Sequence, residues 1–302
     1  MKRIGCYFKS LRLRTLPLSL SGIVVGVGLA AADYNVDGLT VALIALTTVL
    51  LQVLSNVSNE YGDFMSGTDL SESRVGPTYS QGVLTSADYR RMIAVVAVLC
   101  CVSGVLMVWR SFSTLFCLES ILLLILGASA IMAAVRYTLG RNPYGYRGWG
   151  DVYVFLFFGV VSVLGSYFVA AHQLKTWLLM LPAASIGFFS VAVLNVNNIR
   201  DMASDASTRS TVPLKIGVRN AKIYHTLLIA AGWVAMLVYS SLRWLDIMHF
   251  VYVLTLPLFI IHIIGVWKHE GAALDKYLPM LVISTFIFSI LVAFGFTAFL
   301  YL

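Results

Sequence analysis

Acidic and amide side chains recur at a spacing of four residues in two separate parts of the chain. Asn197, Asp201 and Asp205 follow one another at this spacing, and Asn59 and Asp63 repeat it much earlier. On a helix, residues four apart lie along one face. Two carboxylates one turn apart repel each other unless a cation lies between them. Both stretches are therefore candidates for binding a cation.

The chemistry of these groups favours magnesium. Oxygen ligands with no cysteine or histidine nearby suit Mg²⁺ better than zinc, and Mg²⁺ is commonly shared between a few carboxylates and the phosphates of a substrate. Arginine, which offers paired donors to phosphate, and lysine are predicted on the same side of the membrane as both stretches. These basic residues are Arg74, Arg136, Arg141, Arg200, Arg209 and Lys215. The residue types therefore predict a magnesium–phosphate site.

A further carboxylate, Asp69, follows the first stretch. The helix that carries Asn59 and Asp63 is weakened after Gly62 by small residues, Ser66 to Thr68. Glycine and other poor helix formers favour the end of a helix. We therefore expect Asp69 on a loop that folds back toward Asp63.

The elements that must position these groups are membrane-spanning helices. Of the 302 residues, 59% are hydrophobic and 12% are charged, against roughly 25% charged in soluble domains. Nine apolar stretches approach the length of about 20 residues that a spanning helix needs. They are Thr15–Ala32, Leu39–Val57, Met92–Trp109, Leu115–Val135, Val152–Ala171, Thr176–Val196, Ile223–Ser241, Ile247–Val266 and Tyr277–Leu302. The connections are short, so we predict an all-α integral membrane protein, with residues 1–302 forming one polytopic domain around a central cavity.

The basic residues predict the orientation of the chain. With the N-terminus in the cytoplasm, 18 of the 21 lysines and arginines fall on the cytoplasmic side, and Arg110, Lys175 and Arg243 fall outside. Cytoplasmic loops carry such an excess. We therefore expect a multi-pass protein of the cell inner membrane, with the site in the cytoplasm and the C-terminus outside. The net charge of +7 reflects this distribution, which argues against a nucleic-acid partner.

The chain also repeats itself weakly. "NVSNEYGD" (Asn56–Asp63) closes the second predicted span and "NVNNIRD" (Asn195–Asp201) closes the sixth. This spacing predicts two pseudo-repeated four-helix units plus one helix, an arrangement that often places a site at the junction of the halves. The small-residue runs Gly22–Gly28 and Gly127–Ala134 are expected to be helix-packing faces.

Several stretches resemble one family. "NEYGDFMSGTD" and "NVNNIRDMASD" resemble the two aspartate-rich motifs of the UbiA-type intramembrane prenyltransferases. "SLRLRTLPLS" (Ser10–Ser19), "RVGP" (Arg74–Pro77) followed by "SQGVLT", and "YTLGRNPYGYRGWGDVYVFLFFG" (Tyr137–Gly159) are similar to the branch of that family that prenylates 1,4-dihydroxy-2-naphthoate. Glu60 departs from the family pattern, because aspartate is commoner at that position.

The resemblance implies a mechanism and roles for residues. Mg²⁺ would be held by Asp63, Asp69, Asp201 and Asp205 and would bind the diphosphate of a polyprenyl diphosphate. The amides of Asn59, Asn197 and Asn198 would contact metal-bound water or phosphate oxygen, and Arg74, Arg136, Arg200 and Lys215 would neutralise the leaving group. Tyr137, Tyr144 and Tyr146 would offer ring faces to an allylic cation.

The acceptor implied by the resemblance is 1,4-dihydroxy-2-naphthoate, which loses carbon dioxide to give demethylmenaquinone. The polyprenyl tail would lie between apolar helices that are open to lipid. Asp151, after the "PYGYRG" loop, is a candidate for assisting acceptor deprotonation. One alternative is the same catalyst acting on another acceptor, such as 4-hydroxybenzoate, haem or a chlorophyllide; the Asp63–Asp69 spacing and the loop argue against it. A second alternative is a transporter of divalent cations or phosphate, which the gathering of acids at one side disfavours.

Overall fold

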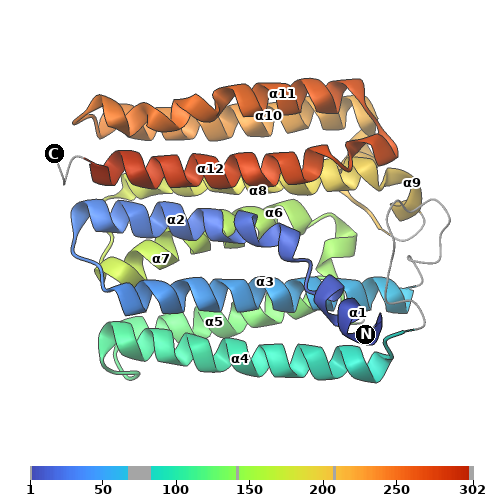
Figure 1. Ribbon diagram of the computed structural model, residues 1–302, viewed down its shortest axis with the longest axis horizontal. Coiled ribbons are helices and arrows are strands. Elements are labelled where there is room, and N and C mark those ends of the chain that lie inside the picture. Colours follow the sequence, from blue (N-terminus) through green and yellow to red (C-terminus); the bar gives the residue numbers. More distant parts are fainter. Residues whose placement is uncertain (1, 67–82, 141–142, 207–208, 299–302) are drawn as a thin grey trace.

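The protein is a bundle of long helices that lie side by side (Figure 1). The computed structural model describes residues 2–66, 83–140, 143–206 and 209–298, and within these ranges the regular elements are all helices. The principal helices are α1 (Lys2–Ser10), α2 (Leu16–Asp33), α3 (Gly38–Ser66), α4 (Ser86–Phe112), α5 (Leu118–Arg136), α6 (Gly150–Val154), α7 (Ser162–Ala171), α8 (Met180–Arg200), α9 (Met202–Asp205), α10 (Val212–Leu242), α11 (Leu256–Lys268) and α12 (Tyr277–Thr297). We call the end of the bundle that carries α1 and α9 the α9 end, and the opposite end, where α2 turns into α3, the far end (Figure 1).

Nine helices in the described ranges are long and apolar enough to cross a membrane, which confirms the predicted number and order of spans. Two boundaries differ clearly from the prediction: α10 begins at Val212 instead of Ile223, and α3 continues past the predicted end at Val57 to Ser66. Gly62 does not end this helix. A Cβ added there would stand 2.6 Å from Thr138 Cβ, so the glycine instead allows the chain after α5 to approach α3 closely. Asn59 and Asp63 therefore lie on a continuous helix.

The fifth span changes its helical pitch in the middle. Between α6 and α7, residues Phe155–Val161 form the π-helical segment η4. Gly159 within it lies against α8, because a Cβ added there would be 2.6 Å from Gly187 Cα. Such wider turns are often found at functional sites. Here the segment brings the adjacent residues Phe157 and Phe158 to the same cavity.

One part of the bundle is filled by an aromatic core. Phe189 of α8, Phe259 of α11 and Phe288 of α12 are fully buried and Trp233 of α10 nearly so. Their ring centroids lie 4.8 Å apart for Phe189–Phe259, 5.1 Å for Phe189–Phe288 and 5.3 Å for Trp233–Phe288. Aromatic pairs at such distances add to the stabilisation from buried area. These contacts tie α8, α10, α11 and α12 together.

The two small-residue runs have different roles. Gly22 and Gly26 of α2 lie against Ser162 and Ser166 of α7, which confirms the first run as a packing face. At Gly127 of α5, an added Cβ would meet nothing within 4 Å. Gly127 and several alanines of that run line a cavity, so the prediction that the second run is a packing face is wrong. The small side chains of this run leave open space beside α5, and no neighbouring helix packs closely against Gly127. The proposed pseudo-repeat of two four-helix units stays a prediction.

The close contact of α2 with α12 yields a stability prediction. A Cβ added to Gly28 would stand 2.8 Å from Ala293 Cα, so Gly28→Ala should destabilise the protein by about 1–3 kcal/mol through overpacking. Gly127→Ala, where an added Cβ meets nothing within 4 Å, is the matched control and should leave the unfolding midpoint unchanged or raise it. Thermal unfolding in detergent measures both. Equal midpoints for the two variants would contradict the assigned contact.

Candidate active site

The predicted stripe of polar residues continues beyond the end of α8. The backbone N–H of Asp201 donates to Asn197 O at 3.0 Å, and the N–H of Asp205 donates to Asp201 O at 2.9 Å. The N–H of Arg209 then donates to Asp205 O at 2.8 Å. The spacing of four is thus kept through α9, and it brings Arg209 into line with the two aspartates.

The side chain of Arg209 joins the two acidic stretches. Its Nη2 donates to Asp63 Oδ1 on α3, and its Nε lies 3.5 Å from Asp205 Oδ1. The carboxylates are almost fully buried, with Asp63 3% and Asp205 1% exposed. A buried carboxylate needs a paired charge or hydrogen bonds. Two segments far apart in the sequence therefore meet around a guanidinium at the α9 end of the bundle.

Asp201 is held by its neighbour in the chain. Arg200 donates to both oxygens of Asp201, at 2.8 and 2.7 Å. The same guanidinium donates to Asn197 Oδ1 at 2.9 Å and to Asp275 Oδ1 at 2.9 Å. Arg200 was predicted to contact the leaving group; in the structure it fixes Asp201 and links α8 to the segment before α12.

Asn59 is positioned by a residue that the sequence did not single out. Thr138 Oγ1 lies 2.9 Å from Ser58 O, to which it donates, and 3.2 Å from Asn59 Oδ1. The signal was present, since Thr138 directly follows Tyr137 at the start of the loop that resembles the family. Asn198, buried on α8, lines a small polar pocket with Tyr137 and Arg209. Asn59, Asn198 and Tyr137 thus surround the paired carboxylates.

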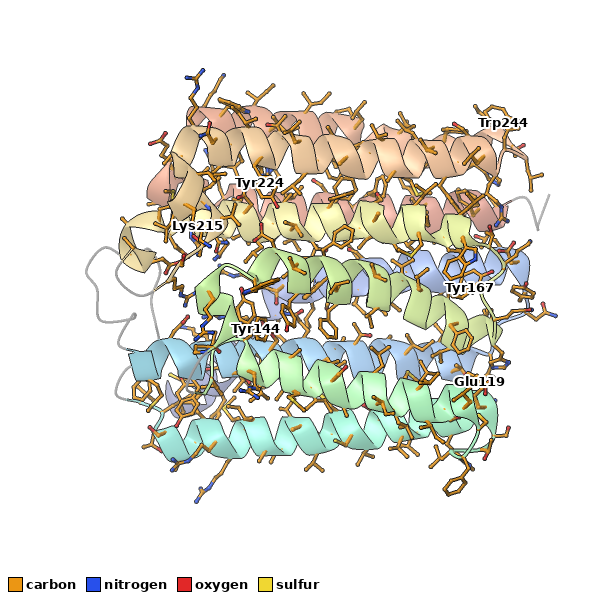
Figure 2. All side chains as sticks on the ribbon, turned by 180° about the vertical axis from the view of Figure 1, so that it is seen from behind. Glu119, Tyr144, Tyr167, Lys215, Tyr224 and Trp244 are labelled. Atoms are coloured by element: carbon orange, nitrogen blue, oxygen red, sulfur yellow. The ribbon has the colours of Figure 1, made fainter. Side chains whose placement is uncertain are left out.

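The other predicted residues divide into two groups. Asp69 and Arg74 lie outside the described residues, as does the side chain of Tyr146. Arg136, at the end of α5, and Lys215, in the first turn of α10, are exposed. Lys215 and Tyr144 lie toward the same end of the bundle (Figure 2). Lys215 Nζ would be 2.9 Å from a Cβ added to Gly148, so it borders the loop after α5.

A large apolar cavity adjoins these residues. Its volume is about 460 Å³, and it extends from Asn59 and Tyr137 to Val108 of α4 and Val169 of α7. Helices α2 to α7, with η4, contribute its walls. At 1.5 Å per residue, the run from Tyr153 to Val169 corresponds to about 24 Å. The cavity is therefore long and mostly apolar, with the polar groups at its α9 end.

Stacked aromatic rings form the cavity wall beside the polar groups. The ring of Tyr144 meets the ring of Tyr137 edge-on, with their centroids 5.3 Å apart, and stacks on the ring of Tyr153, with centroids 3.9 Å apart. Tyr153 stacks in turn on Phe157, at a centroid distance of 6.3 Å. The Tyr144 hydroxyl donates to Ala133 O at 2.7 Å. Tyr153 was missed by sequence reasoning, although its spacing of four from Phe157 indicates a shared helix face.

Both loop tyrosines remain protonated at neutral pH. Burial raises the pKa of Tyr137 to about 12, against a smaller opposing effect of Arg209. Burial also raises the pKa of Tyr144, with smaller contributions from Tyr137 and Tyr153. A phenol with so high a pKa is a hydrogen-bond donor or a neutral ring face, and it is not a base at physiological pH.

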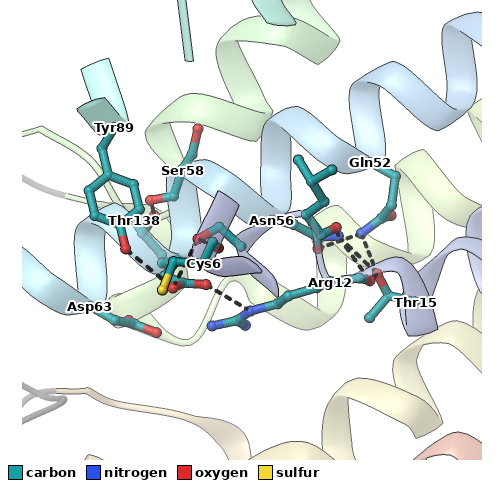
Figure 3. A network of polar contacts seen from close by, with 12 residues as sticks. Cys6, Arg12, Thr15, Gln52, Asn56, Ser58, Asp63, Tyr89 and Thr138 are labelled. Carbon is teal, nitrogen blue, oxygen red and sulfur yellow. Dashed lines mark hydrogen bonds and ion pairs between the residues drawn. The ribbon is translucent and has the colours of Figure 1, made fainter. Parts of the chain in front are cut away.

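Glu60 belongs to a separate polar cluster that fastens the N-terminal segment. Its Oε1 accepts hydrogen bonds from Ser10 Oγ and Tyr89 Oη, each at 3.2 Å, and Arg12 Nε lies 3.7 Å from its Oε2. Nearby, Asn56 Nδ2 donates to Leu11 O at 2.7 Å (Figure 3). Glu60 therefore serves the contact of α3 with α1 and α4, which gives its departure from the family pattern a structural role.

The donor set at the site suits magnesium. Asp63 and Asp205, from different elements, already converge on one positive charge, and carboxylate oxygens are ligands that Mg²⁺ prefers. Among the described residues, no group of three or more His, Cys, Asp or Glu side chains is arranged to hold a metal ion. Asp69, the remaining predicted ligand, lies outside those residues.

Comparison with known proteins identifies the family. Residues 19–291 match the model of the UbiA prenyltransferase family, and the chain belongs to that family. A relative from Escherichia coli (strain K12), named 1,4-dihydroxy-2-naphthoate octaprenyltransferase, is 37% identical over 86% of this chain and 84% of its own. A relative of the same name from Haemophilus influenzae is 31% identical over 97% of this chain and 96% of its own. The predicted membership of this family is confirmed, and the protein is a prenyltransferase.

A solved structure supports the fold. The apo structure of a UbiA homologue from Aeropyrum pernix K1 is similar to this chain with a TM-score of 0.71 at 15% identity. The similarity covers 90% of this chain and 94% of that one. At so low an identity, the match concerns the arrangement of helices. It agrees with the predicted all-α membrane fold.

The network around Arg200 yields a second prediction. Arg200→Ala removes the partner of Asp201, a carboxylate 4% exposed, and leaving a buried charge unpaired should cost about 3 kcal/mol or more. Arg136→Ala, at an exposed position, should change stability by less than about 0.5 kcal/mol. Chemical or thermal unfolding in detergent compares the two. A stability loss for Arg200→Ala no larger than that for Arg136→Ala would contradict the assigned role.

Proposed function

We propose that this protein transfers a polyprenyl group from polyprenyl diphosphate to 1,4-dihydroxy-2-naphthoate, with loss of carbon dioxide, to give the quinol form of demethylmenaquinone. The proposal is supported by relatives of that name that are 31–37% identical over most of the chain. The observation that carries it is the meeting of Asp63 and Asp205 around Arg209, beside an apolar cavity about 460 Å³ in volume. Carboxylates that can hold Mg²⁺, next to an apolar channel, suit a lipid diphosphate, because the metal ion can bind carboxylates and phosphates together.

In this proposal the diphosphate binds at the α9 end. Asp63, Asp201 and Asp205, with Asp69, would hold Mg²⁺, which supplies positive charge that stabilises the departing diphosphate. Asn59 and Asn198 would offer amide groups, and Asn197 would act with Arg200 to orient Asp201. The cations that would neutralise the leaving group are Arg74, Arg136, Lys215 and Arg209.

The carbon chemistry would occur beside the stacked rings. The allylic C–O bond breaks and its electron pair leaves with the diphosphate, while Tyr137, Tyr144 and Tyr153 present ring faces to the positive carbon. The ring carbon that bears the carboxylate forms the new C–C bond. The bond to the carboxylate then breaks, its electron pair restores the aromatic ring, and carbon dioxide leaves. The polyprenyl tail would lie in the apolar cavity.

We further propose an orientation in the membrane. The nine apolar helices found among the described residues make this a multi-pass membrane protein. From the distribution of basic residues we expect the α9 end, with the N-terminus, in the cytoplasm and the C-terminus outside, in the cell inner membrane. A cysteine-labelling experiment with membrane-impermeant reagents on inverted and intact vesicles measures this orientation.

The aspartates provide the test of the reaction. Purified protein is incubated with farnesyl diphosphate, Mg²⁺ and dihydroxynaphthoate labelled in the carboxyl group, and both prenylated product and released carbon dioxide are measured. Asp63→Asn and Asp201→Asn should each lower the rate by at least about 100-fold. Asp37→Asn is the matched control, because Asp37 is exposed at the far end, where it pairs with Arg110, and should retain the full rate.

The same assay tests the choice of acceptor. If 4-hydroxybenzoate replaces dihydroxynaphthoate as the preferred substrate, prenylation proceeds without release of carbon dioxide and the proposed reaction is wrong. Full activity in both aspartate variants would refute the assigned site. Magnesium flux into reconstituted vesicles without any prenyl transfer would instead favour a transporter.

The ring-face role of Tyr137 gives a separate prediction. Tyr137→Phe keeps the aromatic ring beside Tyr144 and should retain activity within about tenfold. Tyr137→Leu keeps an apolar side chain but removes the ring, and losing a desolvated cation–π interaction of about 2 kcal/mol should lower kcat by about 30-fold. Steady-state kinetics of both variants measure the difference. Equal kcat values for the two variants would exclude a role for the ring face.

A further inference from the structure

A carboxylate that the diphosphate site does not use lies close to it. Asp151, in the first turn of α6, is half-buried, and its Oδ2 accepts a hydrogen bond of 3.0 Å from the hydroxyl of Tyr224 on α10. Tyr224 lies on the inner side of α10 toward the α9 end (Figure 2). Within the described part of the chain, Asp151 has no ion pair with lysine or arginine, whereas Asp63 and Asp201 each have one. Among the described lysines and arginines, none therefore pairs with its oxygen atoms.

Asp151 lies in the wall of a small polar pocket. The pocket has a volume of about 10 Å³, enough for roughly one water molecule. Besides Asp151, its walls include Asn198, Arg209 and Tyr137. The guanidinium of Arg209 is engaged with Asp63 and Asp205. The pocket thus connects a carboxylate to the edge of the diphosphate site and admits a water or a hydroxyl group, but no ring.

Tyr137 separates this pocket from the large cavity. It lines both spaces, as the residue common to the two walls. Its hydroxyl is also near the start of α6, because a Cβ added to Gly150 would stand 3.1 Å from Tyr137 Oη. Gly150 directly precedes Asp151. An aromatic substrate that stacks in the cavity beside Tyr137 would therefore bring a ring hydroxyl to the mouth of the pocket.

We propose that Asp151 is the proton acceptor for the ring hydroxyl of the aromatic acceptor, through one water held in this pocket. The inference rests on the proposed function, since it requires a hydroxylated aromatic substrate. A base can act across one water when both hydrogen bonds are within reach. Tyr224 is the positioning residue, because its hydrogen bond holds the carboxylate toward the pocket.

In the proposed reaction, Asp151 accepts the proton of the substrate hydroxyl and later gives it back to the same oxygen. As the ring carbon attacks the allylic carbon, the O–H bond of the substrate breaks, the water passes the proton to Asp151, and the oxygen becomes a carbonyl. The allylic C–O electron pair departs with the diphosphate. When the carboxylate bond breaks, its electron pair moves through the ring to the carbonyl oxygen. That oxygen takes the proton back from Asp151, and the base is regenerated without any other reactant.

Kinetics of Asp151 variants test the proposal. Asp151→Asn is expected to lower kcat by about 100-fold or more, the usual contribution of a general base, with KM for farnesyl diphosphate within about threefold of the wild-type value. Asp151→Glu should recover part of kcat, and Tyr224→Phe should lose about three- to tenfold. Asp37→Asn, the same chemical change at the far end, is the control. A kcat for Asp151→Asn within threefold of wild type would overturn the proposal.

A chemical rescue separates a base from a structural residue. Formate added to Asp151→Gly supplies a carboxylate that can enter the vacated space, and it should raise kcat in proportion to its concentration. It should have no effect on Asp63→Asn. Absence of rescue in an Asp151→Gly protein that unfolds at the wild-type temperature would overturn the proposal. If Asp151→Gly does not fold, the kcat of Asp151→Glu relative to Asp151→Asn decides the question.

Failure of this inference differs from failure of the proposed function. If wild-type protein does not prenylate dihydroxynaphthoate, the proposed reaction fails. If wild type releases carbon dioxide and prenylated product while Asp151→Asn keeps its kcat, the reaction stands and only the assignment of Asp151 fails. The two results are read from the same assay.

Discussion

The buried carboxylates at the α9 end depend on positive charge, and the guanidinium of Arg209 supplies it to two distant parts of the chain. Asp63 and Asp205 are nearly inaccessible to solvent, and unpaired charges so placed would be strongly unfavourable. By pairing with both, Arg209 holds α3 and α9 in register. Arg200 does the same for Asp201 and Asp275. The aspartates can therefore lie close together, because the paired arginines offset the repulsion between their negative charges.

The rest of the bundle divides into a packed part and an open part. The rings of Phe189, Trp233, Phe259 and Phe288 fill the space between α8, α10, α11 and α12. Helix α5, by contrast, contributes a glycine and several alanines to the cavity wall, beside leucines and an isoleucine, and these small side chains leave space open. The packed core holds the helices that carry the polar site in fixed positions, and the open channel beside it leaves room for a long apolar chain.

The aromatic wall connects these two parts chemically. The π-helical segment η4 changes the direction of successive side chains, so that both Phe157 and Phe158 reach the cavity. Tyr153 extends this wall to Tyr144 and Tyr137 at the polar end. Tyr137 then borders both the apolar cavity and the polar pocket of Asp151. One ring thus stands where the tail, the diphosphate and the acceptor of the proposed reaction would meet.

The sequence alone determined the features that depend on local pattern. Apolar runs of sufficient length indicated nine spans, and the spacing of Asn197, Asp201 and Asp205 indicated a shared face, because length and periodicity are properties of neighbouring residues. Only the tertiary structure decided which groups from distant segments meet. It paired Arg209 with Asp63, directed Arg200 to Asp201 and Asp275, turned Glu60 toward α1, and assigned Gly127 to a cavity instead of a helix contact. Those outcomes depend on how whole helices pack against one another, and a local sequence pattern does not show which distant residues will meet.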